Sequence, residues 1–217
     1  MFIQQPNVAV EELHKQDFLS SVNESYEKDA RLCYMHFKDC RIIEDRDLIE
    51  FTYENVYFEN CLFIDCDFSN CSFTDVLFTA CDLSTSKFNK CFFNRCHFSS
   101  VKAVGTDFSD SNIKHTRFID VNFQYADLSY STFNKVLIKD SGFVDAALTH
   151  CMNKALAVEN ANFQKANFFQ TPLKGLNLTT CNIENIVTSN RGEELNGATV
   201  DTYQAAELAK LMGLIVE

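Results

Sequence analysis

The chain has 217 residues, 46% of them hydrophobic, and a formal net charge of −11. This length and apolar content predict one folded domain with a sizeable core. No apolar run approaches membrane-spanning length and the N-terminus has no basic, apolar leader, which excludes a membrane-spanning class and leads us to expect a cytoplasmic protein with no membrane contact.

The negative charge is concentrated at the two ends of the chain. Residues 1–60 carry a net charge of −7, residues 61–183 a net charge of 0, and residues 184–217 a net charge of −4. We expect protein partners and no direct contact with nucleic acid.

Residues 1–50 are expected to form an atypical N-terminal cap. Their apolar residues indicate a short amphipathic helix or an irregular segment around Val10, Leu13 and Phe18. The pairs Met35/Phe37 and Cys40/Ile42 then show a small–large spacing that recurs later in the chain. A first coil can thus begin near residue 33, with a slip in register before Phe51.

Residues 51–200 are organised by a strict period of five. From Phe58 to Ile183, stepping by five, all 26 positions except Ala103 and Asn153 hold a large apolar residue. The position two residues earlier holds only Cys, Val, Ala, Ser, Thr or Leu, and the other three positions are mostly polar. Five residues match neither the helical period nor the strand period, so the chain must turn a corner in every repeat and stack into a solenoid.

The repeat units resemble those of the pentapeptide-repeat family. Typical units are Cys66-Asp67-Phe68-Ser69-Asn70 and Ala126-Asp127-Leu128-Ser129-Tyr130, and the resemblance covers residues 51–188. It implies an all-β fold, a right-handed quadrilateral β-helix in which residues twenty apart stack on one another, followed here by a short C-terminal α-helix.

Residues 201–217 are expected to form that helix and an apolar tail. Asp201 or Thr202 can cap the helix and Gly213 can end it. Two interpretations remain open for this segment: a lid over the last coil, or a lid whose remaining apolar surface joins two copies. For the second, we expect the dimerisation residues to be Leu208, Leu211, Leu214 and Ile215.

No residues of this chain form a recognisable catalytic, cofactor-binding or metal-binding motif. Eight of the ten cysteines occupy the small inward position, with a spacing that is the repeat period and not a zinc-site spacing. We expect reduced thiols that fill space in the core. The scattered histidines His97, His115 and His150 fall at outward positions. The prediction is a protein that is not an enzyme, needs no cofactor and acts through its surface.

The C-terminal segment adds a second, narrower resemblance. Val200 to Val216 read V-x-x-x-Q-x-x-x-L-x-x-L-x-G-L-I-V, similar to the loop-free quinolone-resistance (Qnr-like) pentapeptide-repeat proteins. This resemblance implies a homodimer joined through the C-terminal helix that binds DNA gyrase or topoisomerase IV and protects it from fluoroquinolones, with an acidic rod that mimics DNA. The net charge of 0 over residues 61–183 departs from the acidic rod that this resemblance implies.

The acidic residues that could contact such a partner stack twenty residues apart in the central coils. We expect partner binding at Asp107, Asp120, Asp127 and Asp140. The alternative is that these four are ordinary solvated residues and that the protein is a general interaction scaffold with no role at a topoisomerase. The distribution of charge over the faces distinguishes the two, because a DNA mimic needs a continuous acidic stripe.

Overall fold

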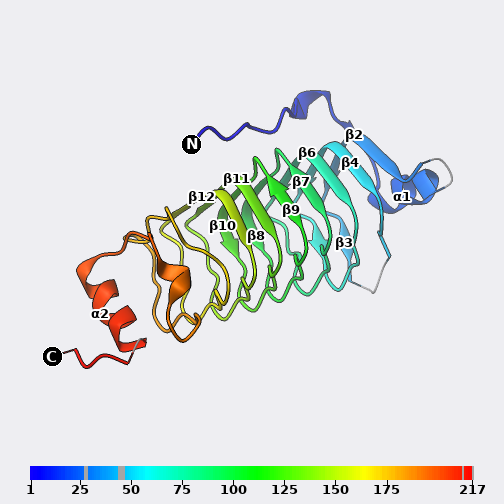
Figure 1. The fold of residues 1–217 in the computed structure, drawn as a ribbon. Helices are drawn as coiled ribbons and strands as arrows, with labels where there is room; N and C mark the ends of the chain where they lie inside the picture. The colour runs from blue at the N-terminus through cyan, green and yellow to red at the C-terminus, as the bar shows by residue number, and fades with distance from the viewer. Residues whose placement is uncertain (27–28, 44–46, 212, 217) are drawn as a thin grey trace.

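The computed structural model describes residues 1–26, 29–43, 47–211 and 213–216. They form a rod-shaped coil with one short helix near each end (Figure 1). Within these ranges no helix is long and apolar enough to cross a membrane.

The described residues form twelve strands and two α-helices, together with two short 3₁₀ turns. The elements in chain order are a 3₁₀ turn at Val10–Glu12, β1 His14–Lys15, α1 Phe18–Tyr26, β2 Arg31–Lys38, β3 Arg41–Ile42, β4 Thr52–Glu59, β5 Leu62–Phe63, β6 Ser72–Thr79, β7 Phe92–Asn94, β8 His97–Lys102, β9 Asn112–Lys114, β10 Arg117–Asn122, β11 Thr132–Lys139, β12 Met152–Glu159, a 3₁₀ turn at Glu193–Leu195, and α2 Thr202–Leu211.

Successive coils stack in parallel with a constant offset of twenty residues. Phe58 pairs with Phe78, and Phe78 pairs with Phe98. The same offset continues through isolated bridges such as Asp107 with Asp127. The fold is therefore the solenoid that the period of five predicts, in the right-handed, four-faced form that the resemblance to pentapeptide-repeat proteins implies. The first coil, β2, pairs with β4 at an offset of 21, since Phe37 lies opposite Phe58, so one extra residue precedes the regular repeat.

Each coil has four faces, which we number by their large inward residue. Face 1 contains Phe73, face 2 Phe78, face 3 Leu83 and face 4 Phe88, and the residue twenty positions later lies on the same face of the next coil.

The corners between faces require an unusual backbone conformation. A non-glycine residue with positive φ occurs at nearly every fifth position, as at Asn60 (52°), Asp65 (55°) and Asn70 (60°). Asparagine and aspartate tolerate this left-handed conformation better than most residues. Their frequency in the repeat is thus explained by the corners.

The core is a stack of aromatic rings lined by small polar donors. Phe73 and Phe93 lie with ring centroids 4.9 Å apart, 5° from parallel. At the small inward position, Ser86 Oγ donates a hydrogen bond to the carbonyl of Phe63, and Cys91 Sγ donates to that of Phe68. Serine and cysteine are interchangeable at this position because both are small and both can donate to the preceding coil.

The cysteines of the coil are buried and form no disulfide bond. Eight are buried, and none of the ten, all of which lie in the described part of the chain, is in a disulfide. Burial raises the pKa of the Cys96 thiol to about 12 and that of Cys151 to about 11. This agrees with the prediction of reduced, space-filling thiols.

The two exceptions to the period of five are accommodated differently. At Ala103 the small side chain lets Phe98 and Phe108 approach to 6.3 Å. At Asn153 the pairing of β11 and β12 shifts register, and a cavity of about 10 Å³ remains beside Phe133 and Leu173. Asn153 Nδ2 donates to the carbonyl of Pro172, but its buried Oδ1 has no partner among the described residues.

Helix α1 covers the N-terminal end of the coil. Phe18, 1% exposed, meets Phe37 and Phe63 edge-to-face at 5.1 Å each. Residues 1–13, which precede this helix and which we call the N-terminal segment, lie along the outside of the rod (Figure 1).

Helix α2 covers the C-terminal end and begins with a reciprocal capping box. Asp201 Oδ1 accepts from the Gln204 backbone N–H, and Gln204 Oε1 accepts from the Asp201 N–H. Gln204 Nε2 also donates to the carbonyls of Leu178 and Cys181, each at 2.8 Å. One glutamine therefore both starts the helix and fixes it to the last coil.

Candidate interaction surfaces

Asp107 and Asp127 lie one above the other on face 4, as predicted from their spacing. Each accepts a hydrogen bond at 2.9 Å from the backbone N–H two residues later, of Ser109 and Ser129 respectively. These carboxylates thus stabilise the turns of the coil as well as adding charge to its surface. Asp107 is half-buried and Asp127 is exposed.

Asp120 and Asp140 lie at the corner that follows face 2, both exposed and both with positive φ. Asp120 accepts from Ser100 Oγ at 2.8 Å, and Asp140 accepts from Asn160 Nδ2 at 3.0 Å. Together with Lys102 they line a shallow depression open to solvent. This pair therefore marks a concave acidic site with a lysine at its edge.

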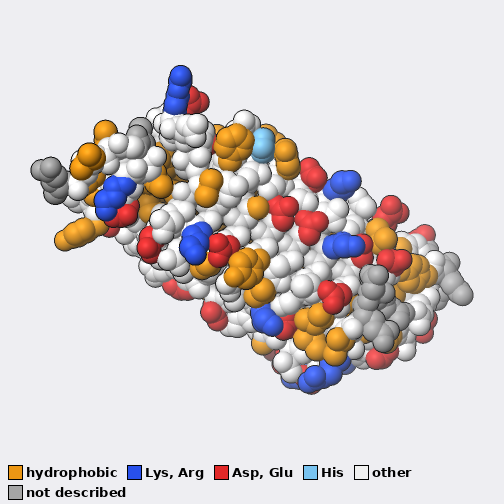
Figure 2. Space-filling view, turned by 90° about the horizontal axis from the view of Figure 1, so that it is seen from below, with side chains coloured by type: hydrophobic (Ala, Val, Ile, Leu, Met, Phe, Trp, Pro, Cys, Tyr) orange, Lys and Arg blue, Asp and Glu red, His pale blue; other side chains and the backbone are white. Residues whose placement is uncertain are grey.

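The structure does not bring the two aspartate pairs together. Face 3, which contains Phe123, lies between Asp120 and Asp127 in the same coil. On the side of the rod shown in Figure 2, acidic and basic side chains alternate, with isolated hydrophobic groups between them. The visible face has local acidic sites instead of a continuous acidic stripe.

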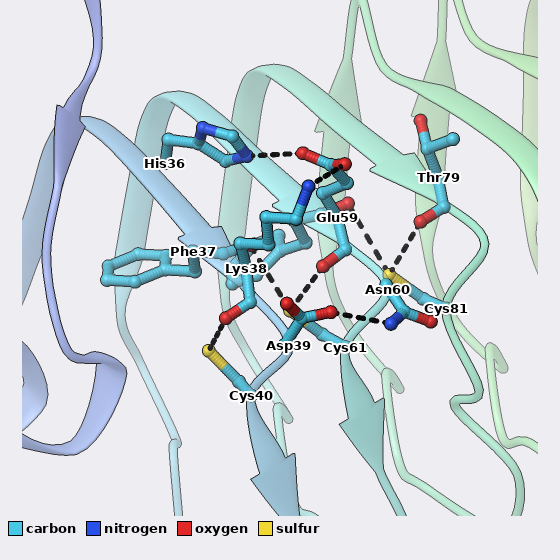
Figure 3. Close-up of polar contacts among 11 residues, drawn as sticks. His36, Phe37, Lys38, Asp39, Cys40, Glu59, Asn60, Cys61, Thr79 and Cys81 are labelled. Atoms are coloured by element: carbon cyan, nitrogen blue, oxygen red, sulfur yellow. Dashed lines mark hydrogen bonds and ion pairs between the residues drawn. The ribbon is translucent and has the colours of Figure 1, made fainter.

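Stacked acids and bases neutralise one another along much of the coil. Figure 3 shows the arrangement near the N-terminal end, where Glu59 accepts from both His36 Nε2 at 2.8 Å and Lys38 Nζ at 2.6 Å. Asn60 Nδ2 also donates to Asp39 at 2.6 Å. Within residues 61–183, whose net charge is 0, acids and bases twenty residues apart form four ion pairs among the described residues: Lys87–Asp67, Arg95–Asp75, Lys102–Asp82 and Lys139–Glu159.

The N-terminal segment covers part of face 1, a contact that the sequence analysis did not predict. The Gln4 N–H donates to His115 Nδ1 at 3.1 Å, and the Arg117 guanidinium donates to the carbonyl of Ile3 at 3.1 Å. The Asn7 N–H donates to Asp75 at 2.9 Å. Most of these bonds use the segment's main chain, so its side-chain sequence gives little signal of them.

His115 is consequently buried, although its position in the repeat points outward. It is 5% exposed, and burial together with the charges of Lys135, Lys114 and Arg95 lowers its pKa. Burial and the charge of Arg117 lower the pKa of His97 as well. Within the described ranges, no group of His, Cys, Asp and Glu residues has an arrangement that could hold a metal ion.

Helix α2 and the tail after it divide into an anchored part and an exposed part. Leu208, 8% exposed, belongs to the core and anchors the helix, which differs from its expected place on a dimer surface. Leu211, Leu214 and Ile215 are 47%, 61% and 92% exposed. Met212 and Glu217 lie outside the described residues. We call Leu211, Leu214 and Ile215 the C-terminal apolar patch.

Comparison with known proteins agrees with the repeat register. A model described as "Pentapeptide repeat region" matches residues 71–148, and one described as "Pentapeptide repeats (8 copies)" matches residues 54–84. No curated protein matches the chain.

Two solved structures illustrate the similarity. A trypsin-treated form of QnrB1, a plasmid-mediated fluoroquinolone resistance protein, is 20% identical, with 94% of this chain and 96% of that chain covered and a TM-score of 0.44. HetL, a pentapeptide repeat protein involved in heterocyst differentiation regulation from the cyanobacterium Nostoc, is 11% identical, with 85% and 94% covered and a TM-score of 0.28. The two family models together match residues 54–148, in the register of the repeats described above, so this part of the chain is similar to pentapeptide-repeat proteins.

Proposed function

We propose that this protein is a non-catalytic rod that binds DNA gyrase or topoisomerase IV and protects the enzyme from fluoroquinolones. The observation that carries the proposal is the C-terminal module. The residues that make Val200–Val216 similar to the quinolone-resistance proteins have clear structural roles here. Gln204 fixes helix α2 to the coil, and Leu208 is buried beneath it.

The same module supports a homodimer. With Leu208 used for anchoring, the C-terminal apolar patch remains exposed at the very end of the rod. Contiguous exposed apolar surface is a mark of protein–protein contact, and a patch at one end suits a two-fold, end-to-end dimer. Such a dimer doubles the length of rod available to a large, two-fold partner.

Within this proposal the enzyme contacts the two separate acidic sites, Asp107/Asp127 on face 4 and Asp120/Asp140 at the corner after face 2. The mixed charge in Figure 2 supports local acidic contacts more than phosphate-like charge along the whole rod. Mimicry of DNA would then be limited to these sites.

The test is a gyrase supercoiling assay with the purified protein, with and without ciprofloxacin. Added protein should restore supercoiling in the presence of the drug. Leu211→Asp, which puts a charge into the apolar patch, should give a monomer by sedimentation and weaken protection. If wild-type protein sediments as a monomer and leaves drug inhibition unchanged, the proposal fails.

A matched pair of charge reversals tests the acidic sites. Asp127→Lys with Asp140→Lys should weaken protection, whereas Asp65→Lys with Asp145→Lys, the same charge change at exposed corners after face 3, should leave it intact. The fold should tolerate both, because the chain already places Lys87 at the repeat position of Asp127 and Lys165 at a left-handed corner.

The second candidate is a general interaction scaffold with another protein partner. The alternation of charge on the visible face and the separation of the two aspartate pairs favour it. This candidate would be supported if the purified protein forms a stable dimer but does not change supercoiling by gyrase, with or without ciprofloxacin.

A further inference from the structure

Positive charge is concentrated on one face of the rod. From Phe92 onward, the outward residues of face 1 and of the corner after it include Lys114, Lys135, Lys154 and Lys174, and no Asp or Glu. Arg95 lies at the same corner but pairs with Asp75. We call the outward residues of face 1 and of this corner from 112 to 174 the lysine face. The zero net charge of the coil is thus a sum over unequal faces.

The lysines of this face differ from most lysines elsewhere in lacking an acidic neighbour. Lys87 pairs with Asp67, Lys102 with Asp82 and Lys139 with Glu159, each twenty residues away. By contrast, Lys114 is stacked between Asn94 and Asn134. In the described part of the chain, the four exposed lysines of this face form no ion pair: Lys114, Lys135, Lys154 and Lys174.

An exposed row of aromatic rings borders the same face. Tyr130 and His150, at the corner before face 1, are stacked with centroids 4.7 Å apart and 15° from parallel. Phe169 meets His150 at 5.7 Å. Tyr130 is 56% exposed and Phe169 38% exposed. We call these three residues the aromatic ridge.

We propose that the lysine face and the aromatic ridge together bind single-stranded nucleic acid. The lysines would contact successive phosphates, and bases would stack on the ridge. Proteins that bind single strands without sequence preference combine these two features, a cationic track and aromatic platforms. A partner that offers only negative charge would use the lysines and leave the exposed rings without a role.

The dimensions fit a short segment of strand. Lys114 and Lys174 are three coils apart, or about 14 Å at a strand spacing of about 4.8 Å. A helical single strand places one phosphate every ~3.4 Å, so four lysines face about four phosphates.

The N-terminal segment limits the site at one end. It is bound at His115 and Arg117, and its first ten residues contain no acidic or basic side chain, so it does not neutralise the lysines. The accessible track therefore runs from Lys114 toward Lys174. This proposal does not depend on topoisomerase binding, and it revises the expectation of no contact with nucleic acid.

The experiment measures fluorescence anisotropy of a labelled oligothymidylate of about 12 nucleotides, a typical site size for such proteins. Wild-type protein should bind, and the logarithm of the binding constant should fall against the logarithm of salt concentration with a slope of about −3, as for four phosphate contacts on a single strand. Changing all four lysines of the face to Gln should weaken binding at least about tenfold and nearly abolish the slope.

Two matched controls test the location of the site. Changing Lys87, Lys102, Lys139 and Lys165 to Gln removes the same charge from other faces and should leave binding within about twofold of wild type, as expected for lysines that contact no phosphate. Tyr130→Ala should weaken binding about tenfold, whereas Tyr125→Ala, a ring of similar exposure on another corner, should not. Circular dichroism melts and the four single Lys→Gln variants check that losses reflect binding and not unfolding.

Three outcomes would overturn the proposal. The first is no binding by wild-type protein at low salt. The second is equal loss in both four-lysine variants, which would indicate diffuse attraction. The third is displacement by polyglutamate as efficient as by unlabelled oligothymidylate, with no effect of Tyr130→Ala, which would identify an acidic polypeptide as the partner. The assay contains no topoisomerase, so its result is independent of the proposed function.

Discussion

Phe78 and Phe98 lie directly over one another in successive coils, with ring centroids 4.6 Å apart and planes 8° from parallel. Twenty residues separate them in sequence, and one strand spacing separates them in space. Aromatic rings stack in this way from Phe37 to Phe118, and the column continues with Ile138 in the next coil, so each layer is buried by its neighbours.

The stacking predicts a large cost for truncating Phe118, the last ring of this column, which lies in the central coils of the rod. Phe118 contacts Phe98 at 4.9 Å and Phe123 at 5.2 Å. Phe118→Ala should lower the free energy of unfolding by about 3–5 kcal/mol, the usual range for a buried phenylalanine. The surface change Asn134→Ala should stay within about 0.5 kcal/mol. Urea melts measure both, and equal effects would contradict the inward assignment of Phe118.

The defect at Asn153 predicts a stabilising substitution. Asn153→Leu would remove the unpartnered Oδ1 and fill the adjacent cavity. We expect a gain of about 1–2 kcal/mol, because an unsatisfied buried polar atom is replaced by apolar contact. Ala103→Leu should instead cost about 1–3 kcal/mol, since Phe98 and Phe108 already occupy the space and the core would be overpacked. Thermal melts showing the reverse order would contradict this account of the two exceptions.

Burial of the thiols predicts an order of chemical labelling. At pH 8 the raised pKa of Cys96 and Cys151 leaves almost no thiolate to react. Cys33, half-exposed and outside the regular coil, should react with iodoacetamide first, and the eight coil cysteines only after denaturation. Peptide mapping by mass spectrometry reads the order. Labelling of coil thiols as fast as Cys33 would show that the coil opens readily.

The contact between Gln4 and His115 predicts that acid releases the N-terminal segment. In the folded state the pKa of His115 is lowered, first by burial, so the neutral ring is favoured and its Nδ1 can accept from Gln4. The hydrogen bond between Gln4 and His115 stabilises the bound N-terminal segment fully above the ordinary histidine pKa of about 6.5. This stabilisation declines as pH falls below that value, because the solvated ring of the released state binds the proton more tightly.

This release can be measured by following the Gln4 amide resonance in an NMR titration from neutral to acidic pH, where the resonance should shift as the hydrogen bond is lost. His115→Gln keeps a hydrogen-bond acceptor but cannot titrate, so its Gln4 resonance should be insensitive to pH over the same interval. An identical transition in wild type and His115→Gln would assign the effect to another group.

The sequence predicted the coil because its strongest pattern, the period of five, depends on burial. Phe73, Phe93 and their equivalents must all face inward, and only a solenoid allows this. The positive-φ corners and the turn hydrogen bonds of Asp107 and Asp127 follow from the same register. They explain why these aspartates occur whether or not a partner binds them.

Two parts of the surface could not be predicted in the same way. The N-terminal segment binds face 1 largely through main-chain groups of Ile3, Gln4 and Asn7, so no side-chain pattern marks the contact. The lysine face was hidden because charge was summed over whole coils. Within residues 61–183, counting charge separately at every twentieth residue would have revealed Lys114, Lys154 and Lys174 in one column without an acid.

The most direct test of the central claim is sedimentation velocity of fluorescently labelled protein mixed with purified DNA gyrase. The account predicts that wild-type protein moves with the enzyme at micromolar concentration and that Asp127→Lys with Asp140→Lys reduces the fraction that does so. Wild-type protein that sediments at its own rate in the presence of excess gyrase, and likewise with topoisomerase IV, would contradict it.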